Sequence, residues 1–180
     1  VLDLSNPRQA RLERVFSAGT VRREGSVDLR RDGEIRLQDS ATFRREPDAV
    51  AWVDQEVIAL ANEGDGKRGP DGIWPGGRGF TLMDLHGQVV FETGDATERH
   101  AVTFGHYPDA RSAAKGVEIE GVASARMGGR RYLFVGSERG SFIEVHDATD
   151  AHQPRAIQLL PTGMSPEGLA TVTGRADGRA

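Results

Sequence analysis

Acidic side chains recur at short turns that stand just before apolar runs. Three of these turns align as EPDAVAW, EIEGVAS and SPEGLAT, with an acid at the same position of each. Carboxylates that gather in one place repel each other, and a bound cation relieves the repulsion. Calcium takes six to eight oxygen ligands from flexible turns, so it is the expected ion. The predicted calcium ligands, with acids from neighbouring turns included, are Asp48, Glu63, Asp65, Glu118, Glu120, Glu138 and Glu167.

The same acids have a simpler interpretation. Each one can cap its own turn by accepting backbone N–H bonds, next to a glycine that supplies a positive φ angle. Repeated turn chemistry alone also produces repeated acids, so the sequence leaves both interpretations open.

Basic side chains form a second candidate site in and near the polar segment 93–117. Arg111, Lys115 and Arg139 suit the binding of a phosphate or another anionic group, and His106 is placed to act as a proton donor. These four residues are the candidate catalytic set. The alternative is a surface loop held by Tyr107-Pro108, because a long polar loop need not bind anything.

The elements that must position these side chains are predicted to be strands. The segment 115–146 holds two apolar runs around Gly128-Gly129, then a third run, and similar units recur elsewhere. The interval from Glu120 to Glu167 is close to the roughly 40 to 50 residues of a propeller blade. We therefore predict an all-β fold of antiparallel propeller-type blades, an incomplete propeller with about three blades in whole or part. Innermost strands line the centre of a propeller, so equivalent acids are expected to converge.

The predicted organisation covers the whole chain. Within the first part, residues 26–43 are predicted to form a hairpin that turns at Asp32-Gly33. The segment 93–117 shows no helical periodicity and is predicted to be irregular. The expected units are the end of one blade plus this hairpin at 1–44, a blade at 45–92, a long rim loop at 93–117, a blade at 118–162, and the start of the next blade with a tail at 163–180.

Composition excludes several classes of function. A formal net charge of -4 over 180 residues gives no basic excess for tracking nucleic-acid phosphates. The absence of cysteine excludes disulfides and thiolate metal sites, and no apolar run reaches the ~18 residues of a membrane span. Histidine ligands normally come in clusters, so the isolated residues His86, His146 and His152 are expected at the surface. Trp52 and Trp74 are expected to pack in the core or between blades.

Several sequence blocks together resemble a known family over residues 45–172. The blocks are REPDAVAW, ANEGD, GRGF, GHYPDAR, KGVEIEGV, YLFVGSERGSF and LLPTGMSPEGL. They are similar to the choice-of-anchor I proteins, which are related to mesenchyme-specific cell-surface glycoprotein and often labelled alkaline phosphatase-like. The chain departs from the family pattern at Ile119, where proline is usual, and at the insert Ile73-Trp74-Pro75.

The resemblance implies an extracytoplasmic β-propeller that is secreted, periplasmic or surface-anchored, distantly similar to the esterase-like phytase propellers. The expected function is that of a calcium-dependent binding or adhesion module for a cell-surface ligand. The alternative is a metal-dependent phosphoric ester hydrolase of phytase-like or alkaline phosphatase-like type, acting on an anionic small molecule. Three blades leave strand edges unpaired, so the rest of a longer chain or an oligomer partner is expected to cover them.

Overall fold

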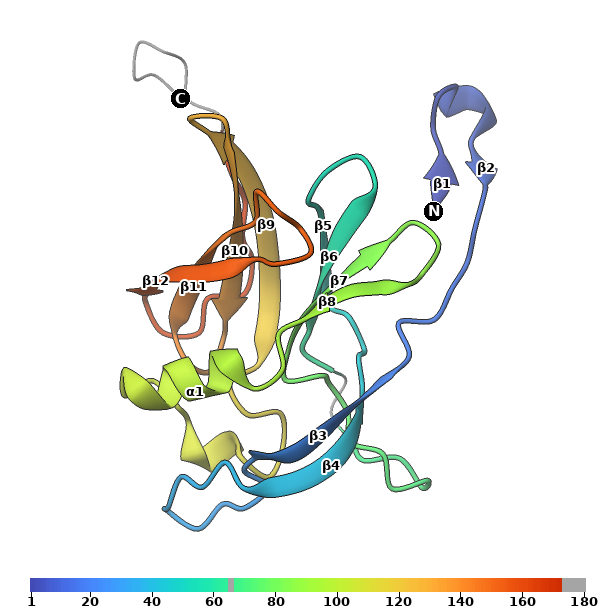
Figure 1. Ribbon diagram of the computed structural model, residues 1–180. Helices are drawn as coiled ribbons and strands as arrows, with labels where there is room; N and C mark the ends of the chain where they lie inside the picture. The colour runs from blue at the N-terminus through green and yellow to red at the C-terminus, as the bar shows by residue number, and fades with distance from the viewer. Residues whose placement is uncertain (65–66, 173–180) are drawn as a thin grey trace.

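Two four-stranded antiparallel sheets form the centre of the protein in a computed structural model that describes residues 1–64 and 67–172 (Figure 1). In each sheet the strands lie side by side in chain order. This arrangement confirms the predicted all-β fold with propeller-like blades. Blade 1 consists of β5 (Ala49–Trp52), β6 (Val57–Asn62), β7 (Gly79–Asp84) and β8 (Val89–Glu92), and blade 2 of β9 (Ile119–Met127), β10 (Arg130–Ser137), β11 (Phe142–Asp147) and β12 (Arg155–Pro161).

The two blades share one apolar core. Strand β6 is rich in apolar residues and is buried over almost its whole length, as expected for a strand covered on both faces. Ala59 and Leu82 from blade 1 and Leu133 and Phe142 from blade 2 are all fully buried in the same cluster. The first strands, β5 and β9, pack against each other and are called the innermost strands below.

The segment that follows blade 2 packs beside β9. Leu169 lies against Gly121 and Gly136, which face each other across β9 and β10 and leave room for its side chain. Thr171 Oγ1 donates a hydrogen bond of 2.9 Å to the Ser124 carbonyl. Ser124 Oγ in turn donates a bond of 2.5 Å to the carbonyl of Trp52. These two hydrogen bonds therefore link Trp52, Ser124 and Thr171, which occupy the same position in the three aligned segments.

Two smaller sheets precede the blades, and the predicted hairpin at 26–43 is wrong in its strand limits. Strand β3 (Thr20–Val27) pairs with β4 (Asp39–Arg44), and the residues between them form a long connection. Asp32-Gly33 lies within that connection and does not form a tight two-residue turn between the paired strands. Both Asp28 oxygens accept backbone N–H bonds, from Arg30 and Arg36, which holds the connection in an irregular path. Before β3, the short strands β1 (Leu2–Asp3) and β2 (Arg11–Leu12) flank a 3-10 turn, η1 (Pro7–Gln9).

The segment 93–117 contains a helix that the sequence analysis did not predict. Helix α1 (Ala96–Thr103) is followed by a 3-10 turn, η2 (Asp109–Arg111). The buried face of α1 is mostly polar, because Thr97 bonds to Glu144 and Glu98 pairs with Arg78. Such a face carries no apolar periodicity, which explains why the pattern predicted a loop. None of the helices in the described part of the chain has the length and apolarity that a membrane crossing requires.

Two single-residue predictions are also corrected. His146 is buried, not at the surface: its ring packs edge-on against Phe80 at 4.8 Å, and its Nε2 lies 3.1 Å from Glu144. Trp52 is 55% exposed and is therefore not a core residue in this structure, whereas Trp74 packs against Phe43 as expected. His86 and His152 are exposed.

Candidate metal centre

The innermost strands bring two of the predicted acids together at one end of the blades. Asp48 immediately precedes β5, and its N–H donates a 2.9 Å bond to the carbonyl of Ala61 near the end of β6. Glu120 lies at the start of β9, which packs beside β5. Glu63 follows directly after β6. In blade 2, Glu138 follows directly after β10, so each blade supplies carboxylates from the start of its first strand and from the end of its second.

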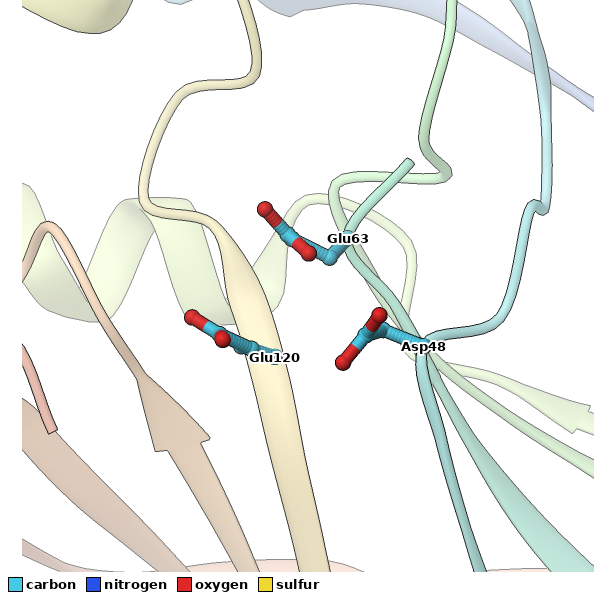
Figure 2. A group of neighbouring side chains, drawn as sticks. All are labelled: Asp48, Glu63 and Glu120. Carbon is cyan, nitrogen blue, oxygen red and sulfur yellow. The ribbon is translucent and has the colours of Figure 1, made fainter. Parts of the chain in front are cut away.

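Three carboxylates converge closely enough to share a cation. Asp48, Glu63 and Glu120 each offer an oxygen, and these oxygens all lie within 4.8 Å of one another. Figure 2 shows the three side chains as neighbours that come from separate segments of the chain. Asp48 is exposed, whereas Glu63 and Glu120 are half-buried, so the group is open to solvent on one side.

The electrostatics of this group disfavour full ionisation of its acids. Burial, the charges of Glu63 and Glu138, a hydrogen bond with Glu138, and the charge of Asp48 together raise the pKa of Glu120 to about 7. Glu120 Oε2 is shielded from solvent and has no hydrogen-bond partner among the described residues. A divalent cation would satisfy this oxygen and offset the repulsion.

A second group of acids lies next to the first but is already neutralised by side-chain cations. Glu63, Glu118 and Glu138 also bring oxygens within 4.8 Å of one another. Lys115 contacts Glu63 and lies 3.4 Å from Glu118. Burial opposes the charge of Lys115, but its hydrogen bond to Glu63 and the charges of Glu118 and Glu63 outweigh it, so its pKa is raised. Here an ammonium group occupies the place that a metal ion would take.

Two arginines complete the ion-pair network around Glu118, whose side chain is 1% exposed. Arg111 Nε lies 2.5 Å from one Glu118 oxygen, and Arg139 Nε lies 3.7 Å from the other. Arg139 also contacts Glu138 at 3.1 Å. Three of the four candidate catalytic residues therefore gather around acids.

His106 and Glu167 do not join either group among the described residues. His106 Nδ1 lies 2.8 Å from the Gly140 carbonyl, and its ring packs edge-on against Phe142. The backbone carbonyl of Glu167 lies close to Gly121, but its carboxylate belongs to neither acidic group among the described residues. Asp65 falls outside the described residues.

A small cavity adds one residue that the predicted set omitted. The cavity has a volume of about 410 Å³ and lies beside the first acidic group. Glu46 lines it together with Asp48, Glu63 and Lys115. The alignment of EPDAVAW with EIEGVAS had already placed Glu46 opposite Glu118, so this signal was present in the sequence.

Comparisons with known proteins identify one family. Residues 71–151 match the sequence model of the choice-of-anchor I domain. The matched stretch begins just before the insert Ile73-Trp74-Pro75 and ends within the connection between β11 and β12, so it includes β7 to β11 and leaves out β5 and β6. The comparisons with curated proteins and with solved structures returned no match. The resemblance inferred from the sequence blocks is confirmed.

Proposed function

We propose that this chain is part of a surface-anchored module that binds its ligand in a calcium-dependent manner, because residues 71–151 match the choice-of-anchor I domain. The family points to a surface or extracellular protein. Calcium dependence and an adhesive role are not implied by the family match, and we base them on the chemistry of the acidic group.

The observation that carries the proposal is the convergence of Asp48, Glu63 and Glu120 from two blades. Their oxygens are hard ligands, and Glu120 Oε2 has no partner in the described part of the chain. A calcium ion bound there would join the head of β5 and the end of β6 to the head of β9. It would thus hold the two blades in a fixed relation and retain coordination positions for water or for a ligand oxygen.

The hydrolase alternative has weaker support. Lys115, Arg111 and Arg139 contact carboxylates, which already balance much of their charge. A phosphate would have to compete with Glu118 for these cations. His106 is oriented by the Gly140 carbonyl and packs on Phe142. We therefore favour a binding module over a phosphoric ester hydrolase.

Calorimetric titration of the full chain with calcium tests the proposal. We expect one calcium ion to bind per chain, and Asp48→Asn to weaken the affinity at least tenfold because it removes a charged ligand. Asp71→Asn, an exposed acid that pairs with Arg44, is the matched control and should bind like the wild type. The absence of calcium binding at millimolar concentration would refute the metal site. Turnover of a chromogenic phosphate ester would instead support the hydrolase alternative.

The backbone behind Glu63 provides an independent test that replaces none of the proposed ligand residues. Gly76 has a φ of +67°, and a Cβ added to it would lie 2.0 Å from the Glu63 carbonyl oxygen. Gly76→Ala should therefore displace the backbone at Glu63 and reduce calcium affinity at least tenfold. Gly105→Ala is the control, since Gly105 has a φ of +74° but open space around it. Equal calcium affinity in the two variants would argue against a role for Glu63.

A further inference from the structure

A large groove lies at the opposite end of the innermost strands from the acidic group. It has a volume of about 900 Å³ and is bordered by the turn after β5 and by the end of β9. The turn after β5 and the end of β9 lie in the upper part of the view in Figure 1, away from α1. Thr171 and Val172 line it as well. A concave space of this size between two blades accommodates an extended small ligand.

The aromatic residue of the groove is Trp52, and it is 55% exposed. Ser124 Oγ bonds to the Trp52 carbonyl, so the backbone that carries the indole is tied to the neighbouring blade. The other tryptophan, Trp74, packs against Phe43 instead. An exposed, anchored indole offers a flat apolar surface at low entropic cost, which suits stacking against a ring-shaped ligand.

The polar lining of the groove carries both signs of charge. Asp54 and Glu56 supply acceptors, whereas Arg126 and Arg131 supply donors. Arg131 pairs with Asp54 at 3.1 Å, so this pair is neutral as a unit. A strongly charged ligand of either sign would meet like charges on one side of the groove. A neutral ligand with many hydroxyl groups both donates and accepts hydrogen bonds, so it matches this lining.

We propose that this groove binds a neutral oligosaccharide, with one sugar ring stacked on Trp52 and its hydroxyl groups bonded to Asp54, Gln55 and Arg126. The site shares no residue with the acidic group. The inference therefore goes beyond the proposed calcium-dependent function and does not depend on it.

The test is a titration of the full chain with defined carbohydrates, followed by tryptophan fluorescence and calorimetry. The neutral probes are the hexasaccharides of cellulose, mannan, amylose and chitin, and the acidic probes are polygalacturonate and heparin. We expect at least one neutral probe to bind with the same affinity in calcium and in EDTA. Trp52→Ala should weaken that binding at least tenfold, Trp52→Phe should retain most of it, and Trp74→Phe should leave it unchanged.

Several results would overturn the proposal. These are the failure of every neutral probe to bind at millimolar concentration, a preference for the acidic polymers, and unchanged binding in a Trp52→Ala variant that circular dichroism shows to be folded. Light scattering provides one more such result. If the wild type is a stable oligomer and Trp52→Ala converts it to a monomer, then a second copy of the chain covers Trp52. A calcium effect on binding would also contradict the independence of the two sites.

Discussion

Replacing Arg78 with methionine is expected to lower the free energy of unfolding by about 3–5 kcal/mol. Arg78 and Glu98 form an ion pair of 3.3 Å in which both side chains are 1% exposed. Burial raises the pKa of Glu98, against the opposing charges of Arg78 and Arg23. Without its partner, Glu98 must either stay charged in an apolar site or take up a proton, and both cost free energy.

The loss of stability would come from more than this ion pair, because Arg78 connects separate segments of the chain. Its guanidinium donates to the carbonyl of Asp28 at 3.0 Å, in the connection between β3 and β4. It also donates to the carbonyl of Ala114 at 3.2 Å, in the segment after η2. The Arg78 side chain thus connects the β3–β4 sheet, helix α1 and the segment that precedes β9.

Urea unfolding of the variants measures this effect. Arg30→Met removes an exposed pair with Asp39 and should cost less than about 1 kcal/mol. The double variant Arg78→Met with Glu98→Gln should recover part of the loss, because no unpaired charge stays buried. A cost for Arg78→Met no greater than for Arg30→Met would show that the buried pair does not govern stability.

Substituting Glu120 with glutamine is expected to stabilise the calcium-free protein above neutral pH and to abolish its response to calcium. The pKa of Glu120 is raised from 4.5 to about 7 by burial and by its acidic neighbours. Between these values the folded state keeps a proton that the unfolded state has lost, so stability falls as pH rises. The full penalty, reached above pH 7, is on the order of 1–2 kcal/mol once solvent screening is allowed for.

Unfolding in EDTA at pH 5 and pH 8 isolates this contribution. Glu120→Gln should be more stable than the wild type at pH 8, and the difference should shrink toward pH 5. Saturating calcium should stabilise the wild type at pH 8 by about 3 kcal/mol, as expected at roughly a hundred times the dissociation constant, but should not stabilise the variant. Glu13→Gln, at an exposed acid, is the control. A variant that is less stable than the wild type in EDTA would contradict the raised pKa.

The blades could be predicted from the sequence because their strands follow simple rules. Apolar runs bounded by glycine-rich turns are typical of strands, and β6 and β10 show this pattern clearly. The alignment of the acidic turns also indicated that Asp48 and Glu120 are equivalent, and the packing of β5 on β9 places them together. Helix α1 could not be predicted in this way, because its buried contacts are polar and link residues far apart in sequence.

The roles of individual acids could not be separated from the sequence. Glu118 and Glu120 are only two residues apart, yet Glu118 is buried among basic side chains, whereas Glu120 faces Asp48 and Glu63. The difference depends on the positive φ of 53° at Glu118 and on Arg139, which arrives from another turn of blade 2. Neither fact is visible in a pattern of residue types. The exposure of Trp52 was missed because an indole on a strand is usually covered.

The backbone turn before β9 has an implication for how this scaffold can change. Glu118 adopts a φ of 53°, and Ser165, the aligned residue in the segment after blade 2, adopts a φ of 50°. An uncharged hydroxyl therefore occupies the same left-handed conformation as a buried carboxylate, although such a conformation costs an ordinary side chain about 1 kcal/mol or more. The left-handed conformation at this position is therefore compatible with a charged or an uncharged side chain. A single substitution can add or remove an acid at Glu118 or Ser165 while the local backbone path is kept, so the charge beside the acidic groups can change without a change in the sheet.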